Sequence, residues 1–373
     1  MRVLVTGSDG FIGKNLCVHL RQRGDLEVLC IEKDDTDAQL AASIDRADFI
    51  FHLAGVNRPV DPAEFAIGNR DLTNKIAELV INSGRAIPIL LTSSLQAQLE
   101  NPYAISKRGA EDALLSRVDQ LSGGVHIFRL PNVFGKWCRP NYNSAVATFC
   151  NNISRGIPIS IHDPASPLTL VYIDDVVGSF ISILDTYKSK TSFVDGPYRE
   201  VSMVYQTTVG EVATHIQHFH DSRRQLSVDA VGNGLLRALY STYLSYLQPA
   251  EFSYPLTKHV DPRGEFAEVL KTANYGQFSY FTAHPGITRG GHYHHTKNEK
   301  FLVVRGRARF GFRHILTNET FQLETSGSEP QVVDTIPGWA HDITNIGDSE
   351  LIVMLWANEV FDRSKPDTIS HNV

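Results

Sequence analysis

Thr6-Gly7-Ser8-Asp9-Gly10-Phe11-Ile12-Gly13 joins a β-branched run, Met1–Thr6, to a segment whose apolar residues recur at helical spacing. This order predicts a buried parallel strand, a tight glycine-rich turn and a helix. The three glycines let backbone N–H groups approach a pyrophosphate, and the N-terminus of the helix adds a favourable dipole. Because the turn lies between a strand and a helix, we interpret it as a dinucleotide-binding site. Its candidate contacts are Gly7, Asp9, Gly10, Phe11, Ile12 and Gly13.

The next two predicted strands supply further candidate contacts to the cofactor. Strand 26–31 ends at Glu32 and Lys33. An acidic residue here would hold the adenine ribose hydroxyls and favour NAD, whereas Lys33 could pair with a 2′-phosphate and favour NADP. We predict Lys33 as a contact and NADPH as the cofactor, with NADH less favoured. A third strand ends in residues whose backbone can lie against the cofactor, Leu53, Ala54 and Gly55.

Three side chains further along the chain suit carbonyl reduction. A predicted strand ends at Ser94, and Tyr103 and Lys107 stand four residues apart on one face of a predicted helix. A lysine cation beside a phenol lowers the pKa of the phenol, which can then exchange a proton near neutral pH. We predict Ser94, Tyr103 and Lys107 as catalytic, with Ser93 as the alternative serine and with Tyr103 and Lys107 also touching the cofactor.

These motifs resemble, over residues 1 to about 245, the extended short-chain dehydrogenases/reductases that act on nucleotide sugars. The resemblance implies a Rossmann-type, doubly wound parallel α/β sheet, with Lys107 holding the nicotinamide ribose. The segment Arg129–Gly135 is similar to the family's sugar-nucleotide segment, which implies that Asn132 lies near the sugar.

A second pattern, near the C-terminus, suits a metal ion. It reads Gly286-x5-His292-x-His294-x4-Glu299-x6-Gly306, followed by Gly338-x2-His341-x3-Asn345. Two histidines one residue apart point to the same face of a strand. With Glu299 and His341 they can complete a site of three histidines and one carboxylate, which suits Zn, Ni, Fe or Mn.

The chain around this pattern changes character. From residue 260 onward it consists of short strands and turns, which predict an antiparallel double-stranded β-barrel. We place the domain boundary between a nucleotide-sugar domain, 1–247, and a metal-binding domain, 248–373. The 286–306 segment resembles the first cupin motif. In the segment that would correspond to the second motif, Pro337 directly precedes Gly338, which departs from the family spacing before His341.

Two segments of the predicted barrel are also similar to epimerases of nucleotide 4-keto sugars, which are themselves cupins. They are Asp261–Glu268 and Arg289–His292. The resemblance implies that Arg263 and Arg289 hold substrate. The base that removes the C3 proton is left open among His284, Lys300 and Tyr280.

Over its whole length the chain resembles bifunctional enzymes of capsule and O-antigen synthesis, most closely in Phe134–Asn143, Tyr240–Tyr246 and His294–Phe301. The resemblance implies the substrate UDP-2-acetamido-2,6-dideoxy-L-arabino-hexos-4-ulose, a UDP-linked 4-keto-6-deoxy-N-acetylhexosamine. It implies C3 epimerisation in the cupin and NADPH-dependent C4 reduction in the first domain. The product would be UDP-N-acetyl-6-deoxy-L-talosamine, on the route to UDP-N-acetyl-L-fucosamine. It also implies a homodimer that carries zinc.

Two alternatives stay open. The first domain could be a 4,6-dehydratase or C4 epimerase, which recycles its cofactor, or the cupin could be a non-catalytic module for dimerisation or sensing.

The composition excludes several other classes of protein. The 373 residues are 42% hydrophobic and 20% charged, as in ordinary globular proteins, and the net charge of −6 gives no electrostatic footprint for nucleic acid or an anionic membrane. The four cysteines lack CxxC spacing, and no apolar run is long enough to span a bilayer. We expect a cytoplasmic protein with no nucleic-acid or membrane partner.

Overall fold

The computed structural model describes residues 1–190, 193, 196–257, 259–261, 264–266, 270, 276–359 and 364–373. Residue contacts divide the chain into two compact units. The first comprises Met1–Arg139 and Leu168–Gln206, and the second comprises Pro140–Pro167 and Thr207–Val373. The division into sequence domains at 247 and 248 stays a prediction.

The first unit is built on a parallel sheet of six strands in the order β2-β1-β3-β4-β5-β8. The strands are β1 (Arg2–Thr6), β2 (Glu27–Ile31), β3 (Phe49–His52), β4 (Ile89–Ser94), β5 (Val125–Leu130) and β8 (Tyr198–Arg199). The order reverses between β1 and β3, and ligands of such sheets bind outside the carboxyl ends of the strands at this point. The predicted doubly wound fold is confirmed, and the glycine-rich turn follows β1 at the reversal.

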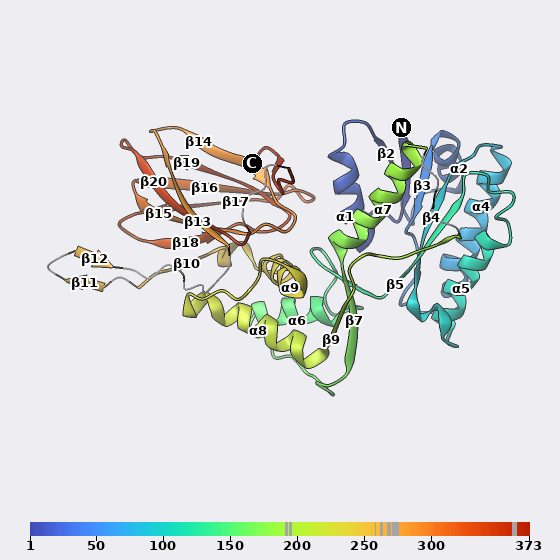
Figure 1. Ribbon diagram of the computed structural model, residues 1–373, viewed down its shortest axis with the longest axis horizontal. Helices are drawn as coiled ribbons and strands as arrows, with labels where there is room; N and C mark the ends of the chain where they lie inside the picture. The colour runs from blue at the N-terminus through green and yellow to red at the C-terminus, as the bar shows by residue number, and fades with distance from the viewer. Residues whose placement is uncertain are drawn as a thin grey trace. The chain divides into compact units, whose positions relative to one another are not determined.

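Helices cover both faces of this sheet, with α1 and α7 on one side and α2, α4 and α5 on the other (Figure 1). The helices of the unit are α1 (Phe11–Arg21), α2 (Asp37–Arg46), α3 (Ala63–Phe65), the π-helix η1 (Ala66–Asp71), α4 (Leu72–Asn82), the 3₁₀-helix η2 (Leu95–Gln98), α5 (Pro102–Leu115) and α7 (Ile173–Lys188). Between sheet and helices lies a core of fully buried aliphatic side chains, among them Leu4, Ile50, Ile76, Leu114 and Ile127. A smaller sheet has the order β6-β7-β9, in strands Asn132–Phe134, Pro167–Tyr172 and Tyr205–Thr208.

The second unit combines three helices with a β-barrel. The helices α6 (Ala145–Ser154), α8 (Val209–Gln225) and α9 (Gly234–Leu244) pack on one another. Thr208 and Glu211 form a capping box that fixes the start of α8. The 3₁₀-helix η3 (Pro249–Glu251) then leads into the barrel.

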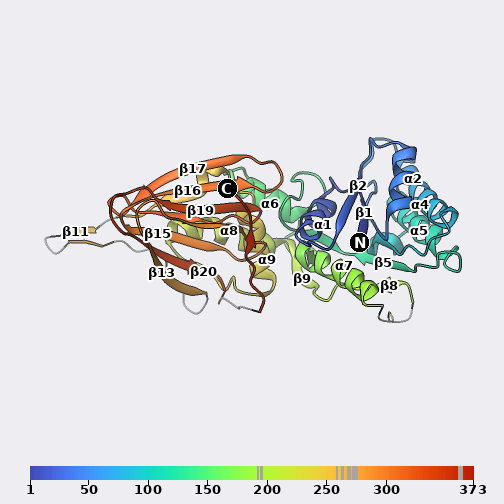
Figure 2. The same ribbon diagram turned by 90° about the horizontal axis from the view of Figure 1, so that it is seen from above.

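The barrel consists of two five-stranded antiparallel sheets, as predicted, in the orders β10-β18-β15-β20-β13 and β17-β16-β19-β14-β21. Figure 2 shows β16, β17 and β19 in one layer and β13, β15 and β20 in the other. The strands are β10 (Ser253–Pro255), β13 (Gln277–Ala283), β14 (Thr288–Tyr293), β15 (Glu299–Arg305), β16 (Arg307–His314), β17 (Thr320–Ser326), β18 (Gln331–Asp334), β19 (Trp339–Asn345), β20 (Leu351–Ala357) and β21 (Ile369–Ser370), with a separate hairpin of β11 (His259–Asp261) and β12 (Gly264–Phe266).

Aromatic side chains join the two sheets. The ring of Phe301 on β15 lies 5.8 Å from Phe310 on β16 and 6.1 Å from His341 on β19. Because side chains alternate along a strand, Glu299 shares the inner face of β15 with Phe301, whereas Lys300 points to the outer face.

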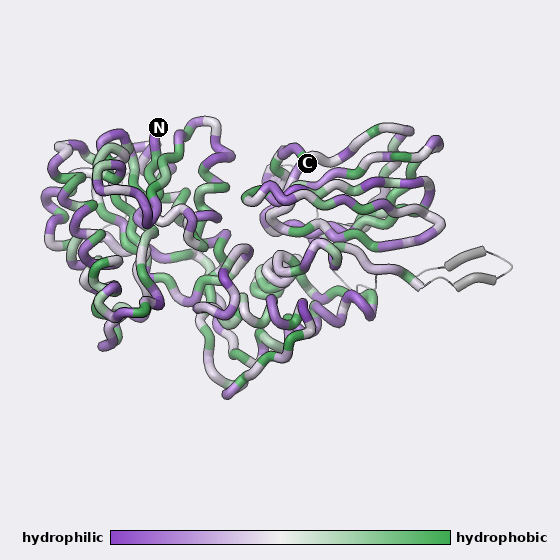
Figure 3. The backbone as a smooth tube through the Cα atoms, turned by 180° about the vertical axis from the view of Figure 1, so that it is seen from behind, coloured by the Kyte–Doolittle hydropathy of each residue, from purple (hydrophilic) through white to green (hydrophobic). Residues whose placement is uncertain are grey.

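Hydrophobic and hydrophilic segments alternate along the helices (Figure 3). Within the described residues, none of the helices has both the length and the apolar character that a membrane crossing requires.

Candidate functional site

The glycine-rich turn packs tightly against the end of β3. Gly7 has a positive φ of 68°, and a Cβ there would lie 2.8 Å from the Ala54 Cα. A Cβ on Gly13 would lie 2.1 Å from the Gly7 carbonyl oxygen. These positions therefore require glycine. The N-cap of α1 is Gly10, which has no side chain that could accept a hydrogen bond from the first turn. The first N–H groups of this 11-residue helix can therefore bind an acceptor outside the helix, such as a phosphate oxygen.

Glu32 and Lys33 differ sharply in their surroundings. The Glu32 carboxylate accepts hydrogen bonds from the Ser8 hydroxyl and from the Asp9 N–H, the latter at 2.7 Å. It is thus drawn against the glycine-rich turn. Lys33 is exposed at the end of β2.

The structure brings the three predicted catalytic side chains together. The Ser94 hydroxyl is close enough to Tyr103 to lower the pKa of the phenol. One helical turn beyond Tyr103, the buried Lys107 ammonium donates to the Thr92 carbonyl at 3.2 Å. A Cβ on Gly55 would lie 3.1 Å from Lys107 Nζ, so the lysine reaches the predicted cofactor contacts.

The predicted electrostatic effect of Lys107 on Tyr103 is wrong for this structure. Burial raises the pKa of Tyr103 above its ordinary value, and the opposing contribution comes from the hydrogen bond with Ser94. Burial also lowers the pKa of Lys107 to about 8, against the raising effect of the Glu111 charge. In both cases the loss of water around the side chain is the largest contribution, and Lys107 is the more deeply buried of the two.

Ser93, the alternative serine, has a different partner. Its hydroxyl donates to Glu111, a carboxylate that is only 1% exposed. Arg129 donates to the same carboxylate at 2.9 Å, and Tyr198 does so at 3.1 Å. Glu111 stands four residues after Lys107 on α5, and sequence analysis did not identify it; the i, i+4, i+8 series from Tyr103 was the available signal.

Asn69 was also missed. It lies on the π-helix η1, where its amide bonds both the N–H and the carbonyl of Val56 at 3.0 Å and donates to Ser106 at 3.0 Å. A Cβ on Gly55 would come within 2.7 Å of its Oδ1. Asn69 therefore holds the backbone that faces Lys107, and no spacing rule in the sequence marks it.

The predicted substrate residues fall in three different situations. Asn132 is exposed on β6 and donates to the Thr169 carbonyl at 3.2 Å. Arg263 lies outside the described residues. Arg289 donates to the Thr282 carbonyl at 3.1 Å, and its guanidinium lies 5.0 Å from the centre of the Phe281 ring.

A β-bulge places Arg289 on the same face as His292. Arg289 pairs with Ile343 and His292 pairs with His341, with the register shift between Gly290 and His292. Positions 341 and 343 share a face of β19, so their partners do as well. Three residues apart on a regular strand, Arg289 and His292 would point to opposite faces.

The four predicted metal ligands converge inside the barrel. The ligand atoms of His292, His294, Glu299 and His341 all lie within 4.8 Å of one another. Glu299 Oε2 lies 3.2 Å from His294 Nε2 and 3.6 Å from His341 Nε2. Each of these residues except His292 is buried, which leaves one side of the cluster more open.

The surroundings of the cluster fit a bound cation. Both ring nitrogens of the buried His341 have no hydrogen-bond partner within the described residues. Burial alone would raise the pKa of Glu299, but His294 and His341 hold it well below its ordinary value. Three imidazoles and an ionised carboxylate are a donor set suited to zinc or a similar divalent ion.

Two of the three proposed bases point away from this cluster. Lys300 alternates with Glu299 and points out of the barrel, where it bonds Asp334 at 2.6 Å. Tyr280 is 73% exposed. His284 lies in the turn before β14, eight residues before His292. Lys300 and Tyr280 are therefore wrong as candidates, because side-chain alternation turns them out of the barrel, whereas His284 stays a prediction.

Lys300 belongs to a buried charge network on the outer face of the sheet. Asp334 binds both Lys300 and Arg223, each at 2.6 Å. Burial alone would lower the pKa of Lys300, but Asp334 raises it above its ordinary value. The network connects α8 to the barrel through Arg223.

Lys300→Met is expected to destabilise the second unit by about 3–5 kcal/mol, because it leaves the Asp334 charge buried with one partner fewer. Thermal unfolding checks this, with the exposed Arg305→Met on the same strand as the control. A melting temperature as high as that of the control would contradict the assigned role of the network.

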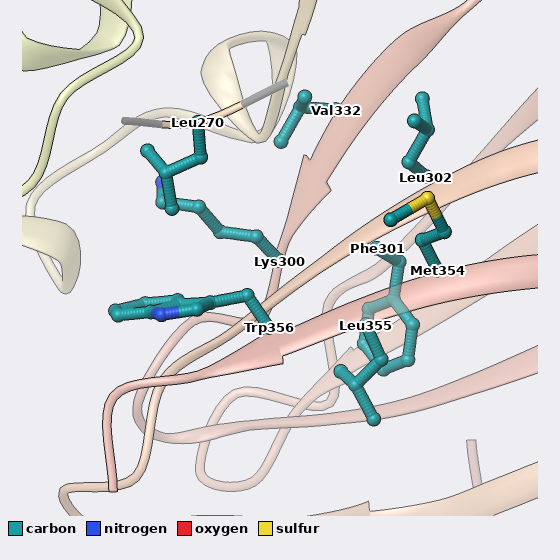
Figure 4. A pocket seen from close by; sticks show the side chains of 8 residues that line it. All are labelled: Leu270, Lys300, Phe301, Leu302, Val332, Met354, Leu355 and Trp356. Atoms are coloured by element: carbon teal, nitrogen blue, oxygen red, sulfur yellow. The ribbon is translucent and has the colours of Figure 1, made fainter. Parts of the chain in front are cut away.

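A pocket in the barrel is lined by Leu270, Lys300, Phe301, Leu302, Val332, Met354, Leu355 and Trp356 (Figure 4). Its lining is apolar apart from Lys300, and it contains none of the four ligands. We therefore assign the reactive centre of the barrel to the histidine cluster.

The fold and these two clusters define an extended short-chain dehydrogenase/reductase joined to a cupin. Residues 3–194 match the NAD-dependent epimerase/dehydratase family, and residues 259–369 match the polysaccharide biosynthesis C-terminal domain. A UDP-2-acetamido-2,6-beta-L-arabino-hexul-4-ose reductase of Pseudomonas aeruginosa is 55% identical over 373 residues, which cover 100% of this chain and 99% of the relative.

Two solved structures are similar over 100% of both chains. One is the capsular polysaccharide assembling protein CapF from Staphylococcus aureus, at 40% identity with a TM-score of 0.68. The other is CapF with the inhibitor 3-isopropenyl-tropolone, at 36% identity with a TM-score of 0.63. The chain belongs to this family of nucleotide-sugar reductases, within the NAD-dependent epimerases/dehydratases.

Proposed function

We propose that the chain acts twice on UDP-2-acetamido-2,6-dideoxy-L-arabino-hexos-4-ulose. The cupin inverts C3, and the first domain then reduces the C4 ketone with NADPH to UDP-N-acetyl-6-deoxy-L-talosamine. The product feeds UDP-N-acetyl-L-fucosamine for capsule or O-antigen. The observation that carries the proposal is the presence in one chain of the Ser94–Tyr103–Lys107 cluster and the four-ligand cluster. The name of the full-length relative supports the 4-keto substrate.

The first domain supplies the groups that a ketone needs when hydride arrives at C4. The developing alkoxide takes a proton from the Tyr103 hydroxyl, and Ser94 donates a hydrogen bond to the same oxygen. Lys107 holds the nicotinamide ribose, as its position beside Gly55 supports. Asn132 contacts the sugar.

The barrel supplies the groups for proton exchange at C3. A 4-keto group makes the C3 proton acidic, and a divalent metal bound by His292, His294, Glu299 and His341 would stabilise negative charge on the keto oxygen. We propose zinc for this site, and we propose that Arg263 and Arg289 bind the substrate. Arg289 lies on the same face of β14 as His292, which supports its role in binding the substrate.

Proton NMR of the purified protein with the UDP-linked 4-keto sugar in D2O, without nicotinamide, tests the proposal. Deuterium is expected to enter at C3, and later addition of NADPH is expected to give the 4-hydroxy product. Consumption of NADPH with C3 still protonated would show a reductase with a non-catalytic cupin. Release of product without net oxidation of NADPH would show a dehydratase or C4 epimerase.

The preference for NADPH rests on Lys33. Glu32 is turned toward Ser8 and Asp9, so its charge is partly compensated, while Lys33 is exposed for a 2′-phosphate. We further propose that the protein is a cytoplasmic homodimer.

Lys33→Ala is expected to raise the KM for NADPH about tenfold and to leave the KM for NADH unchanged. A charge-assisted hydrogen bond contributes roughly 1.5–3 kcal/mol, and about 1.4 kcal/mol corresponds to tenfold. Initial rates with the two cofactors give the ratio, with NADH as the internal control. Equal changes for both cofactors would contradict a contact between Lys33 and the phosphate.

A further inference from the structure

The C-terminal tail returns to the metal cluster. Its strand β21 pairs with β14 at the position of a ligand, since His292 lies opposite Ser370 and Tyr293 opposite Ile369. The tail therefore forms the edge of the sheet that carries the His292–His294 pair.

Asp367 in this tail binds the loop between β14 and β15. Its Oδ1 accepts the His295 N–H at 2.9 Å. Its Oδ2 accepts the N–H groups of Thr296 and Lys297, each at 2.7 Å, and the Thr296 hydroxyl at 3.2 Å. One carboxylate thus accepts hydrogen bonds from three successive backbone N–H groups just after the end of β14. It thereby fixes the path of the loop between the ligands His294 and Glu299.

The same residue contacts a ligand directly through its backbone. His294 Nδ1 is hydrogen-bonded to the Asp367 carbonyl oxygen. Because a carbonyl can only accept, Nδ1 donates this bond, which leaves Nε2, 3.2 Å from Glu299 Oε2, as the nitrogen that would bind a cation. The tail therefore selects the tautomer of His294 that can bind a cation.

The tail also orients Lys297. Its ammonium lies 3.2 Å from Glu299 Oε1 and donates to the Thr368 hydroxyl at 3.3 Å. From the other side, Ser241 on α9 donates to the Thr296 carbonyl at 3.1 Å. The loop that carries His295–Asn298 is consequently held between α9 and the tail.

We propose that Asp367 is a positioning residue of the metal centre, through which the C-terminal tail sets the geometry of His294 and of the 295–297 loop. This inference rests on the proposed metal site. Removing the carboxylate leaves the loop free to shift, and the His294 ring loses the fixed orientation that its Nδ1 bond provides. The metal should then dissociate faster although all four ligands are present.

The test uses full-length wild type, Asp367→Asn and Asp367→Ala, with Asp348→Asn in the exposed β19–β20 turn as the matched control. Each protein is loaded with Co2+. Its visible absorption spectrum is recorded, and the loss of Co2+ to excess chelator is timed. Loss of such a partner typically costs about 10- to 100-fold in metal affinity. We expect Asp367→Ala to lose Co2+ about 10- to 100-fold faster than wild type, with an altered spectrum.

Asp367→Asn should be intermediate, because its amide oxygen can replace one carboxylate oxygen but not both. Asp348→Asn should match wild type. The melting temperature of each metal-free protein separates the alternatives. A metal-free Asp367→Ala that melts well below the control, with an unchanged cobalt spectrum and dissociation rate, would overturn the inference in favour of a purely structural tail. Failure of wild type to bind Co2+ would overturn it together with the proposed metal centre.

Discussion

Tyr103→Phe is expected to lower the rate of C4 reduction by about 10²- to 10⁴-fold, the usual contribution of a positioned proton donor. The substitution removes one hydroxyl and leaves the ring beside Phe65 at a centroid distance of 5.8 Å. Hydride addition would then leave an alkoxide with no donor in place. Exchange of the C3 proton should continue at the wild-type rate, because the ligand cluster contains no part of this site.

The measurement combines the rate of NADPH oxidation with deuterium incorporation at C3. Tyr187→Phe is the matched control, since it removes a tyrosine hydroxyl from the same unit, where that hydroxyl bonds the Ala86 carbonyl at 3.4 Å. Equal loss of both activities in Tyr103→Phe would contradict the division of labour between the domains.

The parts of both sites that sequence could predict are those set by local geometry. The glycine-rich turn was predictable because its close approaches, such as the 2.1 Å from a Gly13 Cβ to the Gly7 oxygen, tolerate only glycine. Tyr103 and Lys107 share a helix face through their spacing of four. His292 and His294 share a strand face through their spacing of two.

The parts that sequence could not predict depend on long-range packing. Asp367 meets the 295–297 loop from about 70 positions away, and the pairing of β21 with β14 has no local signal. The bulge that turns Arg289 to the face of His292 inverts the ordinary rule of alternation. The prediction that Lys300 faces the barrel interior was wrong for the opposite reason. Ordinary alternation with Glu299 puts Lys300 on the outer face, as its bond to Asp334 shows.

The pKa of Tyr103 illustrates a different limit. Sequence shows that a lysine is near, but the sign of the shift depends on how much water each group loses. In the structure desolvation outweighs the hydrogen bond with Ser94, so the phenol keeps its proton more strongly than a free tyrosine. A group that must donate a proton to an alkoxide can still do so, because the alkoxide is the stronger base.

His292→Ala combined with His294→Ala is expected to lower the rate of C3 deuterium exchange by about 10²-fold or more. Lewis-acid stabilisation is worth several kcal/mol, and each 1.36 kcal/mol is a factor of ten in rate. The control replaces His215 and His218 on α8, of which the latter is exposed beside Asp229 at 3.5 Å. Metal content and C3 exchange are measured together, and wild-type exchange in a metal-free double variant would contradict a metal-dependent epimerase.

The Tyr103→Phe variant and the double histidine variant can also be combined in one experiment. Tyr103→Phe should convert the substrate to its C3-inverted ketone and stop there, whereas the double histidine variant should reduce that ketone but be unable to make it. Mixing them with substrate and NADPH should restore the 4-hydroxy product if the intermediate diffuses freely. A mixture that shows C3 exchange but forms no product would mean that the intermediate passes between the sites of one molecule without release.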